Sequence, residues 1–474
     1  MISHFLRSVS RWIFFAALVY APWAYGATTS ESIQITNWVL LAALVLWAIE
    51  LLVSWRTPRF PRLLFFLTAA LICVGGWMVF NAKSIYDSDF SVFVPLRNFA
   101  PPVAGSVDYP ISAAWMIRGA LLLGIILFVA DLSQSNRWLL RLWYVIGLVG
   151  GSIAFLGLLQ KATGARMILW QPPPPEPVWV HTFFATYYYH GNAGAFLNLV
   201  WPLSAGLVIR AFSNRSNPGM RAVWISLFIV TIAGVLANTS RMSQVLALVL
   251  LFAICAQFGL ALLRNLSGSE KGIALAGGLA ILLALIALAQ AVHLEQPLKR
   301  WQTESQRIST DARWYAFRVA MGAVPDARLC GFGPGTFRVV FPTYNIESVN
   351  QAPGTWRFLH DDYLQTLLEW GWIGGILWAL LFFGGIAIGI HSYHRRRQVW
   401  MPRRAVLQPL VVIALLGVAL HALVDFPLQI ESIQLYVATY LGICWGSALW
   451  RDGRSASESQ SSFVRSETSK AETK

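Results

Sequence analysis

The sequence places one histidine and two carboxylates together where a long polar segment meets an apolar run. His360 is followed directly by Asp361 and Asp362. A histidine that a neighbouring carboxylate orients can act as a general base near neutral pH. A helix N-cap made by one of the two aspartates explains the same residues, and the pattern alone favours that simpler interpretation.

Two arginines are candidates for binding an anion. Arg313 lies in the first turn of a predicted amphipathic helix that Pro325 ends. Backbone N–H groups at a helix N-terminus favour an anion, and a guanidinium presents a pair of donors to a phosphate group. An ion pair with Asp311 or Glu304 is the alternative. Arg241 lies in a short turn between two apolar runs, where its side chain can also simply extend to the membrane interface.

Other ionisable residues lie near the ends of apolar runs. His421 and Asp425 are four residues apart, a spacing that places them on one face of a helix. Ionisable groups at membrane depth are costly and often functional, although a structural hydrogen bond between these two is an equal alternative. His190 opens a run rich in Gly and Ala, which favours close helix packing. Arg118 lies within another apolar run, and we expect it to face the same cavity as the other candidates.

Two short motifs are not expected to carry chemistry. Asp87 and Asp89 match the Asp-x-Asp of metal-dependent sugar-nucleotide transferases, but a match of two residues is very weak. The glycine-rich residues 331–335 lack the strand–loop–helix setting of a dinucleotide-binding loop, so we predict a rigid turn there. The cysteines and histidines show no metal-ligand spacing, and we predict no disulfide.

The elements that hold these residues follow from composition. Of the 474 residues, 56% are hydrophobic and 12% are charged, against roughly 25% charged residues in an ordinary globular protein. A soluble fold of this size could not bury so much apolar surface, and the same figures exclude a disordered chain and a disulfide-stapled secreted scaffold. We predict an all-α integral membrane protein. Its net charge of +14 then reflects where Lys and Arg lie relative to the membrane. No nucleic-acid partner is expected.

Apolar runs of about 20 residues can cross roughly 30 Å of hydrocarbon as helices. The sequence contains about twelve such runs. They lie at residues 12–27, 36–55, 63–81, 112–131, 138–160, 193–212, 221–238, 242–263, 272–292, 363–390, 405–425 and 432–450.

Arginine and lysine alternate with these runs. They gather in every second connection, for example at residues 56–62 and 395–404, and are absent from the short connections 28–35 and 426–431. The positive-inside rule therefore predicts that both termini are cytoplasmic. We expect residues 451–474, rich in Ser, Glu, Thr and Lys, to form a disordered cytoplasmic tail.

Three segments on the opposite side are longer than a connection requires, at residues 82–111, 161–192 and 293–362. We predict that the longest is a structured, functional element. Its many cations indicate an anionic partner, while ion pairs with acids of the same segment account for part of them. The candidate histidine and the two candidate arginines all fall on this side.

In their order along the chain, these motifs resemble the O-antigen ligase and polymerase superfamily of bacterial envelope glycosyltransferases. Asp361 stands where many members have Asn or Ser, and Met242 and Ser243 stand where two glycines often follow the arginine. The resemblance covers residues 185–430 and rests on residues 239–241, 313–314, 331–337, 360–375 and 421–426.

The resemblance implies an enzyme with about twelve spans and one large periplasmic loop, residues 293–362. It would lie in the bacterial inner membrane with its active site facing the periplasm. The donor would be a glycan linked through diphosphate to a polyprenol such as undecaprenol. The acceptor would be another glycan or a lipid A-core sugar of lipopolysaccharide, and membrane lipids would be the remaining partners.

The resemblance also implies roles for the candidate residues. Arg241 and Arg313 would bind the donor diphosphate, and His360 would deprotonate the acceptor hydroxyl. A single displacement would invert the anomeric centre, with no metal and no other cofactor. Supporting roles near these residues would fall to Asp361, His421, Asp425 and His190.

Other functions remain open at this point. A twelve-span transporter or flippase of lipid-linked glycans should show paired hydropathy halves and helices broken at the midplane. Here the ionisable residues gather at the outer ends, which favours the enzyme. A protein-glycosylating transferase of the same superfamily would differ only in its acceptor, and a ligase and a repeat-unit polymerase both fit the motifs.

Overall fold

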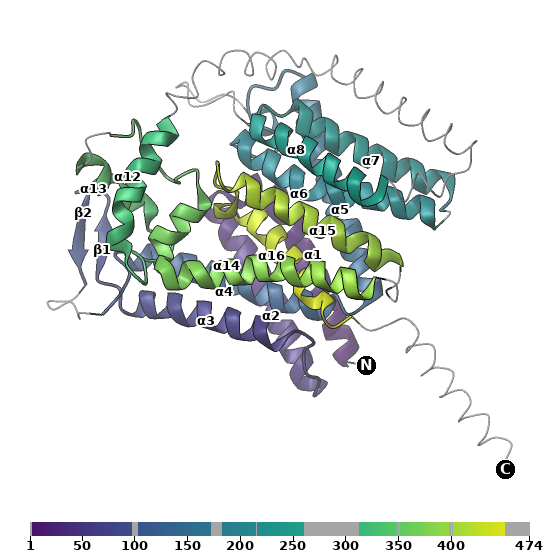
Figure 1. Ribbon diagram of the computed structural model, residues 1–474, viewed down its shortest axis with the longest axis horizontal. Coiled ribbons are helices and arrows are strands. Elements are labelled where there is room, and N and C mark those ends of the chain that lie inside the picture. The colour runs from purple at the N-terminus through teal and green to yellow at the C-terminus, as the bar shows by residue number, and fades with distance from the viewer. Residues whose placement is uncertain are drawn as a thin grey trace, which may run out of the picture.

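A computed structural model describes residues 2–96, 103–171, 183–214, 216–259, 312–347, 351–397, 400 and 402–450. The described residues form a bundle of long helices, with two shorter helices and a small hairpin gathered at one end (Figure 1). Nine of the described helices are long and apolar enough to cross a membrane. The chain is therefore an α-helical membrane protein.

The described residues up to Gly259 form eight helices and one hairpin. The helices are α1 (Ile2–Trp23), α2 (Ser30–Val53), α3 (Arg62–Phe80), α4 (Tyr109–Leu132), α5 (Asn136–Ala162), α6 (His190–Ser213), α7 (Pro218–Ala237) and α8 (Arg241–Ile254). Helix α8 continues as one π-turn, Cys255–Gly259. The hairpin strands are β1 (Ser84–Asp87) and β2 (Val92–Pro95).

The next described residue after Gly259 is Ala312, where the remaining helices begin. These are α12 (Ala312–Ala327), α13 (Phe337–Glu347), α14 (Asp362–Arg396), α15 (Pro402–His421) and α16 (Glu431–Ser447). Three short 3₁₀ turns complete the described elements, at Tyr25–Ala27, Ile168–Trp170 and Pro427–Gln429.

Most predicted spans coincide with a described helix, but several ends differ. Helix α1 begins ten residues before the predicted run at 12–27, and α14 extends beyond residue 390 to Arg396. The predicted span 272–292 and the tail 451–474 lie outside the described residues.

The prediction that His421 and Asp425 share one helix face is wrong, because α15 ends at His421. The N–H groups of Val424 and Asp425 both donate to the His421 carbonyl at 3.1 Å, which closes the helix with a single turn. Pro427 follows and disfavours a helical conformation of the residue before it. Asp425 therefore lies in a connection, which lets its side chain approach other elements.

Residues 84–95 depart from the all-helical prediction. Strands β1 and β2 pair antiparallel, with Ser84 opposite Pro95 and Asp87 opposite Val92. In the turn, Asp87 Oδ1 accepts hydrogen bonds from the N–H groups of Asp89 and Phe90, at 2.9 and 3.3 Å. The Asp-x-Asp motif therefore forms a hairpin turn.

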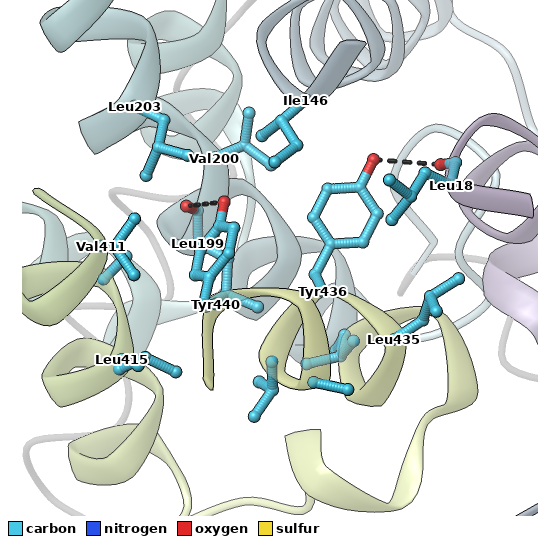
Figure 2. Packing of buried hydrophobic residues seen from close by; sticks show 14 of the residues in the cluster. Leu18, Ile146, Leu199, Val200, Leu203, Val411, Leu415, Leu435, Tyr436 and Tyr440 are labelled. Atoms are coloured by element: carbon cyan, nitrogen blue, oxygen red, sulfur yellow. Dashed lines mark hydrogen bonds between the residues drawn. The ribbon is translucent and has the colours of Figure 1, made fainter. Parts of the chain in front are cut away.

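Buried tyrosines join α16 to its neighbours in the main core. Tyr436 donates its hydroxyl to the Leu18 carbonyl of α1 at 3.0 Å, and Tyr440 donates to the Leu199 carbonyl of α6 at 2.8 Å (Figure 2). Both tyrosines are fully buried. Because a buried hydroxyl without a partner is costly, these bonds fix how α16 sits between α1 and α6.

An ion-pair network lies at the C-terminal ends of α2 and α4. Glu50 pairs with Arg7 and with Arg56, and Arg56 also pairs with Asp131 at 2.7 Å. The network joins α1, α2 and α4 with the connection after α2. It brings together cations that the sequence assigns to one side of the membrane.

The predicted rigid turn is present at residues 331–335. Gly331, Gly333 and Gly335 have φ values of +79°, +117° and +76°, which L side chains rarely adopt. The turn docks on α14, where Glu369 accepts the N–H groups of Gly335 and Phe337 at 2.9 and 3.3 Å. It thereby fixes the start of α13 against α14.

Helix α12 runs two residues beyond the predicted stop at Pro325 and ends at Ala327. A proline in the last turn removes only one intrahelical hydrogen bond, so the helix tolerates it there. The buried side chains of α12 and α13 form a separate small core with α14. Its members include Ala316, Ala320, Phe337, Phe341, Leu359 and Leu368.

Candidate active site

The loop end of the bundle surrounds a cavity of about 2290 Å³. Its walls come from α2, α4, the starts of α6, α8 and α12, and the connections before α14 and after α15. This volume exceeds the roughly 300–1,000 Å³ of an ordinary small-molecule site. Six of the residues singled out in the sequence line it: Arg118, His190, Arg241, Arg313, His360 and Asp425.

His360 and Asp425 form a hydrogen-bonded pair in this cavity. His360 Nδ1 lies 3.0 Å from Asp425 Oδ1. A carboxylate accepts only, so Nδ1 donates its proton, and in the neutral form of the ring Nε2 is an acceptor. Within the described part of the chain, Nε2 has no hydrogen-bond partner. The ring can therefore accept a proton through Nε2.

Aromatic rings surround the His360 side chain. The ring of Phe426 is 4.6 Å away, Trp356 is 5.8 Å away and Tyr189 is 6.1 Å away, all nearly perpendicular to the imidazole. His360 itself has a φ of 62°, a backbone conformation uncommon for residues other than glycine. Backbone and side chain are thus both held by the surrounding packing.

Asp425 is the centre of a wider polar cluster. Its Oδ1 also accepts the N–H of Phe426 at 3.0 Å, and its Oδ2 accepts the Tyr189 hydroxyl at 3.1 Å. Burial alone would raise the pKa of Asp425, but the imidazoles of His360 and His421 hold it well below its usual range. Asp425 is therefore ionised and can stabilise a positive charge on His360.

Arg313 joins this cluster from α12. Its Nη1 donates to the Val424 carbonyl at 3.1 Å, and its Nη2 donates to the Tyr189 hydroxyl at 3.4 Å. As predicted, Arg313 lies in the first turn of its helix. Tyr189 therefore connects Arg313 to Asp425, so that the guanidinium and the histidine pair share one support.

Arg241 is the first residue of α8 and lies on the cavity wall. The turn before it is fixed by Ser240, whose hydroxyl caps α8 and accepts from Ser243 Oγ at 2.8 Å. Ser243 in turn contacts Gly194 of α6 so closely that a Cβ on this glycine would overlap Ser243 Oγ. Ser243 thus takes a packing role against α6.

Residues 226–379 match the family described as O-antigen ligase. Over these residues, the predicted resemblance to the O-antigen ligase and polymerase superfamily is confirmed. The matched residues include Arg241, Arg313 and His360. No curated protein matches the chain.

The residues that match the O-antigen ligase family end before Asp425, which binds His360. Asp425 and His421 both lie beyond residue 379, and Tyr189 and His190 lie before residue 226. The fold brings these four residues close to the matched region in space. The site therefore extends beyond the part of the chain that the family match covers.

Asp361 adopts the capping arrangement that the residue pattern favours. Its Oδ1 accepts the N–H groups of Tyr363 and Leu364, both at 3.0 Å, at the start of α14. Burial raises the pKa of Asp361. Asp362 instead anchors the connection after α15 by accepting from Leu428 and Gln429, both at 2.8 Å. The carboxylate bonded to the His360 ring belongs to Asp425.

His421 and His190 support the site from two sides. His421 is 1% exposed, and its Nε2 lies 3.7 Å from Asp425 Oδ2, a distance too long for a hydrogen bond. The carbonyl of His190 accepts from Asn238 Nδ2 at 2.8 Å, which ties α6 to the turn before Arg241. His190 also lines the cavity, whereas His421 lies behind Asp425.

Several site residues were not identified from the sequence. Tyr189 is the link between Asp425 and Arg313, and its only signal is a run of three tyrosines before His190. Arg338 and Arg357 also line the cavity, although the sequence shows them only as part of a general excess of cations in the long segment.

Proposed function

We propose that this protein is an inverting glycosyltransferase that moves a glycan from a polyprenyl diphosphate carrier to a hydroxyl group of an acceptor sugar. The observation that carries this proposal is the His360–Asp425 pair, which opens into the same cavity as Arg241 and Arg313. A base and two cations in one cavity match the needs of this reaction. The O-antigen ligase match supports the same reaction class.

The histidine pair supplies the base. The acceptor hydroxyl gives its proton to His360 Nε2 as its oxygen attacks the anomeric carbon of the donor. Asp425 stabilises the imidazolium that forms, because its ionised carboxylate accepts the Nδ1 hydrogen bond. General-base catalysis of this kind contributes about 10²–10⁴-fold to the rate.

The two arginines stabilise the leaving group. As the bond between the anomeric carbon and the diphosphate oxygen breaks, its electron pair moves to the diphosphate. Arg241 and Arg313 meet that charge with guanidinium groups, which suit phosphate oxygens better than ammonium groups do. Diphosphate is a good leaving group, so this mechanism requires no metal ion, no cofactor and no separate general acid.

The proposed site faces the periplasm of the bacterial inner membrane, and both termini are cytoplasmic. The alternation of cations along the sequence supports this orientation. The network around Glu50 lies at the end of α2 away from the cavity, as expected for the cytoplasmic side. A reporter fused beside exposed Arg328 should be periplasmic, and a cytoplasmic reporter would contradict the orientation.

A reconstituted transfer assay tests the proposed reaction. Purified protein in lipid nanodiscs is given a polyprenyl-diphosphate glycan and a candidate acceptor glycan, and products are separated by mass and by anomeric configuration. We expect a glycosidic product of inverted configuration. Movement of the donor across a vesicle membrane without product would instead identify a flippase.

Ligase and polymerase share this chemistry and differ in the acceptor. Deleting the gene and separating surface glycans on a gel distinguishes them. Long chains left on the carrier lipid would identify a ligase, whereas single repeats on the core would identify a polymerase. Modification of protein instead of glycan would identify a protein-glycosylating transferase.

A further inference from the structure

A second group of cations lines the cavity apart from Arg241 and Arg313. Arg338 belongs to α13, Arg357 belongs to the connection before α14, and Arg118 belongs to α4. The proposed mechanism uses none of these three. Arg118 is 6% exposed and is fixed in place by the Gln429 carbonyl at 2.6 Å and Gln434 Oε1 at 2.7 Å.

The charges of Arg338 and Arg357 are not balanced by nearby acids in the described part of the chain. Neither arginine forms an ion pair there, and the charged neighbour that acts on Arg357 is Arg338. Partial burial and the charge of Arg338 lower the pKa of Arg357. Arg118 also lies within electrostatic range of Arg357, although Glu431 and Glu369 offset its charge.

The nearby acids whose side chains the structure describes have other partners. Asp326 accepts the Tyr344 hydroxyl at 2.8 Å, and Asp361 caps α14. Glu369 accepts backbone N–H groups of the glycine-rich turn and Asp362 holds the connection after α15. Like charges brought together repel, by about 1 kcal/mol at 4 Å in water and more in a less polar cavity. A bound anion would relieve this repulsion.

The position of Arg357 relates this cation pair to the base. Arg357 follows Trp356, whose ring centre is 5.8 Å from that of His360, and Phe358 stacks on Phe426 at 4.8 Å. The same short connection therefore carries both Arg357 and the proposed base. Arg241 and Arg313 come from other elements, and two guanidinium groups already match the two negative charges of a diphosphate diester.

We propose that Arg338 and Arg357, supported by Arg118, bind an anionic group of the acceptor glycan, a phosphate or a carboxylate, close to the hydroxyl that reacts. This inference rests on the proposed function and adds the charge of the acceptor to it. Binding of the anion at this pair would hold the acceptor hydroxyl near His360. The protein would therefore prefer acceptor glycans that carry a negative charge.

Steady-state transfer kinetics with matched acceptors test this inference. The acceptors are a neutral oligosaccharide, the same sugar as a phosphate monoester, and the same sugar oxidised to a carboxylate. The variants are Arg338→Gln, Arg357→Gln and their Lys counterparts. Arg318→Gln is the control, because Arg318 is an exposed residue of α12 that does not line the cavity.

For each Gln variant we expect the KM for an anionic acceptor to rise about tenfold or more, the usual size for one charge-assisted contact. The KM for the donor and the KM for the neutral acceptor should not change, which also shows that the variant is folded. The KM of each Lys variant for an anionic acceptor should lie between that of the unaltered protein and that of the Gln variant. The phosphate and carboxylate arms show which anion the pair prefers.

Two results would overturn the inference. An unchanged KM for both anionic acceptors would remove the acceptor role, and a higher KM for the donor would assign the arginines to the diphosphate instead. A failure of the proposed function is a separate result, because then the unaltered protein would transfer glycan to none of the three acceptors.

Discussion

His360 and Asp425 are 65 residues apart in the sequence, yet Nδ1 of the first lies 3.0 Å from Oδ1 of the second. The pair forms where the connection before α14 meets the connection after α15. It leaves Nε2 of the histidine available to the cavity. The chemistry of the site depends on this relationship.

Replacing Asp425 with Asn should keep the shape of the side chain and remove its charge. The imidazolium formed during transfer would lose its stabilising partner, so we expect kcat to fall about 10²–10⁴-fold, the range for general-base catalysis. Transfer rates at saturating substrate measure this effect. A variant with full kcat would show that Asp425 does not assist the base.

The low pKa of Asp425 also predicts a pH dependence of stability. Because its pKa is lower in the folded state than the roughly 3.9 of an unfolded Asp, its contribution is complete above about pH 4. The contribution is lost as the pH falls further toward the folded-state pKa. The difference in Tm between the unaltered protein and Asp425→Asn should therefore shrink between pH 6 and pH 3. A difference that grows toward pH 3 would contradict the prediction.

Tyr189→Phe should uncouple Arg313 from Asp425 while keeping the aromatic packing. Loss of the two hydrogen bonds of the hydroxyl should lower kcat/KM by about 5- to 30-fold, equivalent to about 1–2 kcal/mol. Tyr86→Phe in the hairpin is the matched control, because Tyr86 lies outside the cavity. Equal kinetics in the two variants would show that the Tyr189 hydroxyl has no part in transfer.

Arg313→Lys and Arg241→Lys should weaken use of the donor more than use of the acceptor. An ammonium group keeps the charge but loses the paired donors of the guanidinium, so the donor KM should rise about tenfold. Arg318→Lys on the exposed face of α12 is the control. If the donor KM stays at its original value in both variants, the diphosphate role is wrong.

Gly191→Ala should disturb the site without adding or removing a polar group. A Cβ at this position would overlap Asp425 Oδ2 and the Tyr189 ring, so the carboxylate must shift. We expect a loss of about 1–3 kcal/mol in stability, together with reduced transfer. Gly76→Ala is the control, since nothing lies within 4 Å of a Cβ there. Equal Tm values for the two variants would contradict the predicted overlap.

The sequence predicted much of the fold because membrane spans are long and strongly apolar. It also placed Arg241, Arg313 and His360 on one side, and the structure brings all three to one cavity. These predictions depend on local composition and on the alternation of cations. Both signals can be read without knowing how the helices pack.

The partner of His360 could not be predicted in the same way. The spacing of His421 and Asp425 indicated a shared helix face, but α15 ends four residues before Asp425. Which carboxylate meets His360 is decided by how α14 and α15 pack, and the neighbouring Asp361 serves as a helix cap instead. Tyr189 was missed for the same reason, since its role depends on contacts with distant segments.

The hairpin at residues 84–95 was missed for a different reason. Its two strands have only four residues each, too few to show a clear alternation of polar and apolar side chains. The Asp-x-Asp residues match a metal-dependent transferase motif only weakly. In the structure Asp87 accepts backbone hydrogen bonds in the turn, one of them from Asp89.

Glycan transfer by His360→Ala tests the central claim most directly. The variant is compared in nanodiscs with the unaltered protein and with His391→Ala, which removes an exposed histidine from the far part of α14. We predict that His360→Ala loses transfer by at least about 10²-fold at unchanged protein abundance and Tm, while His391→Ala keeps full activity. Full transfer by His360→Ala would contradict the claim that this histidine is the base.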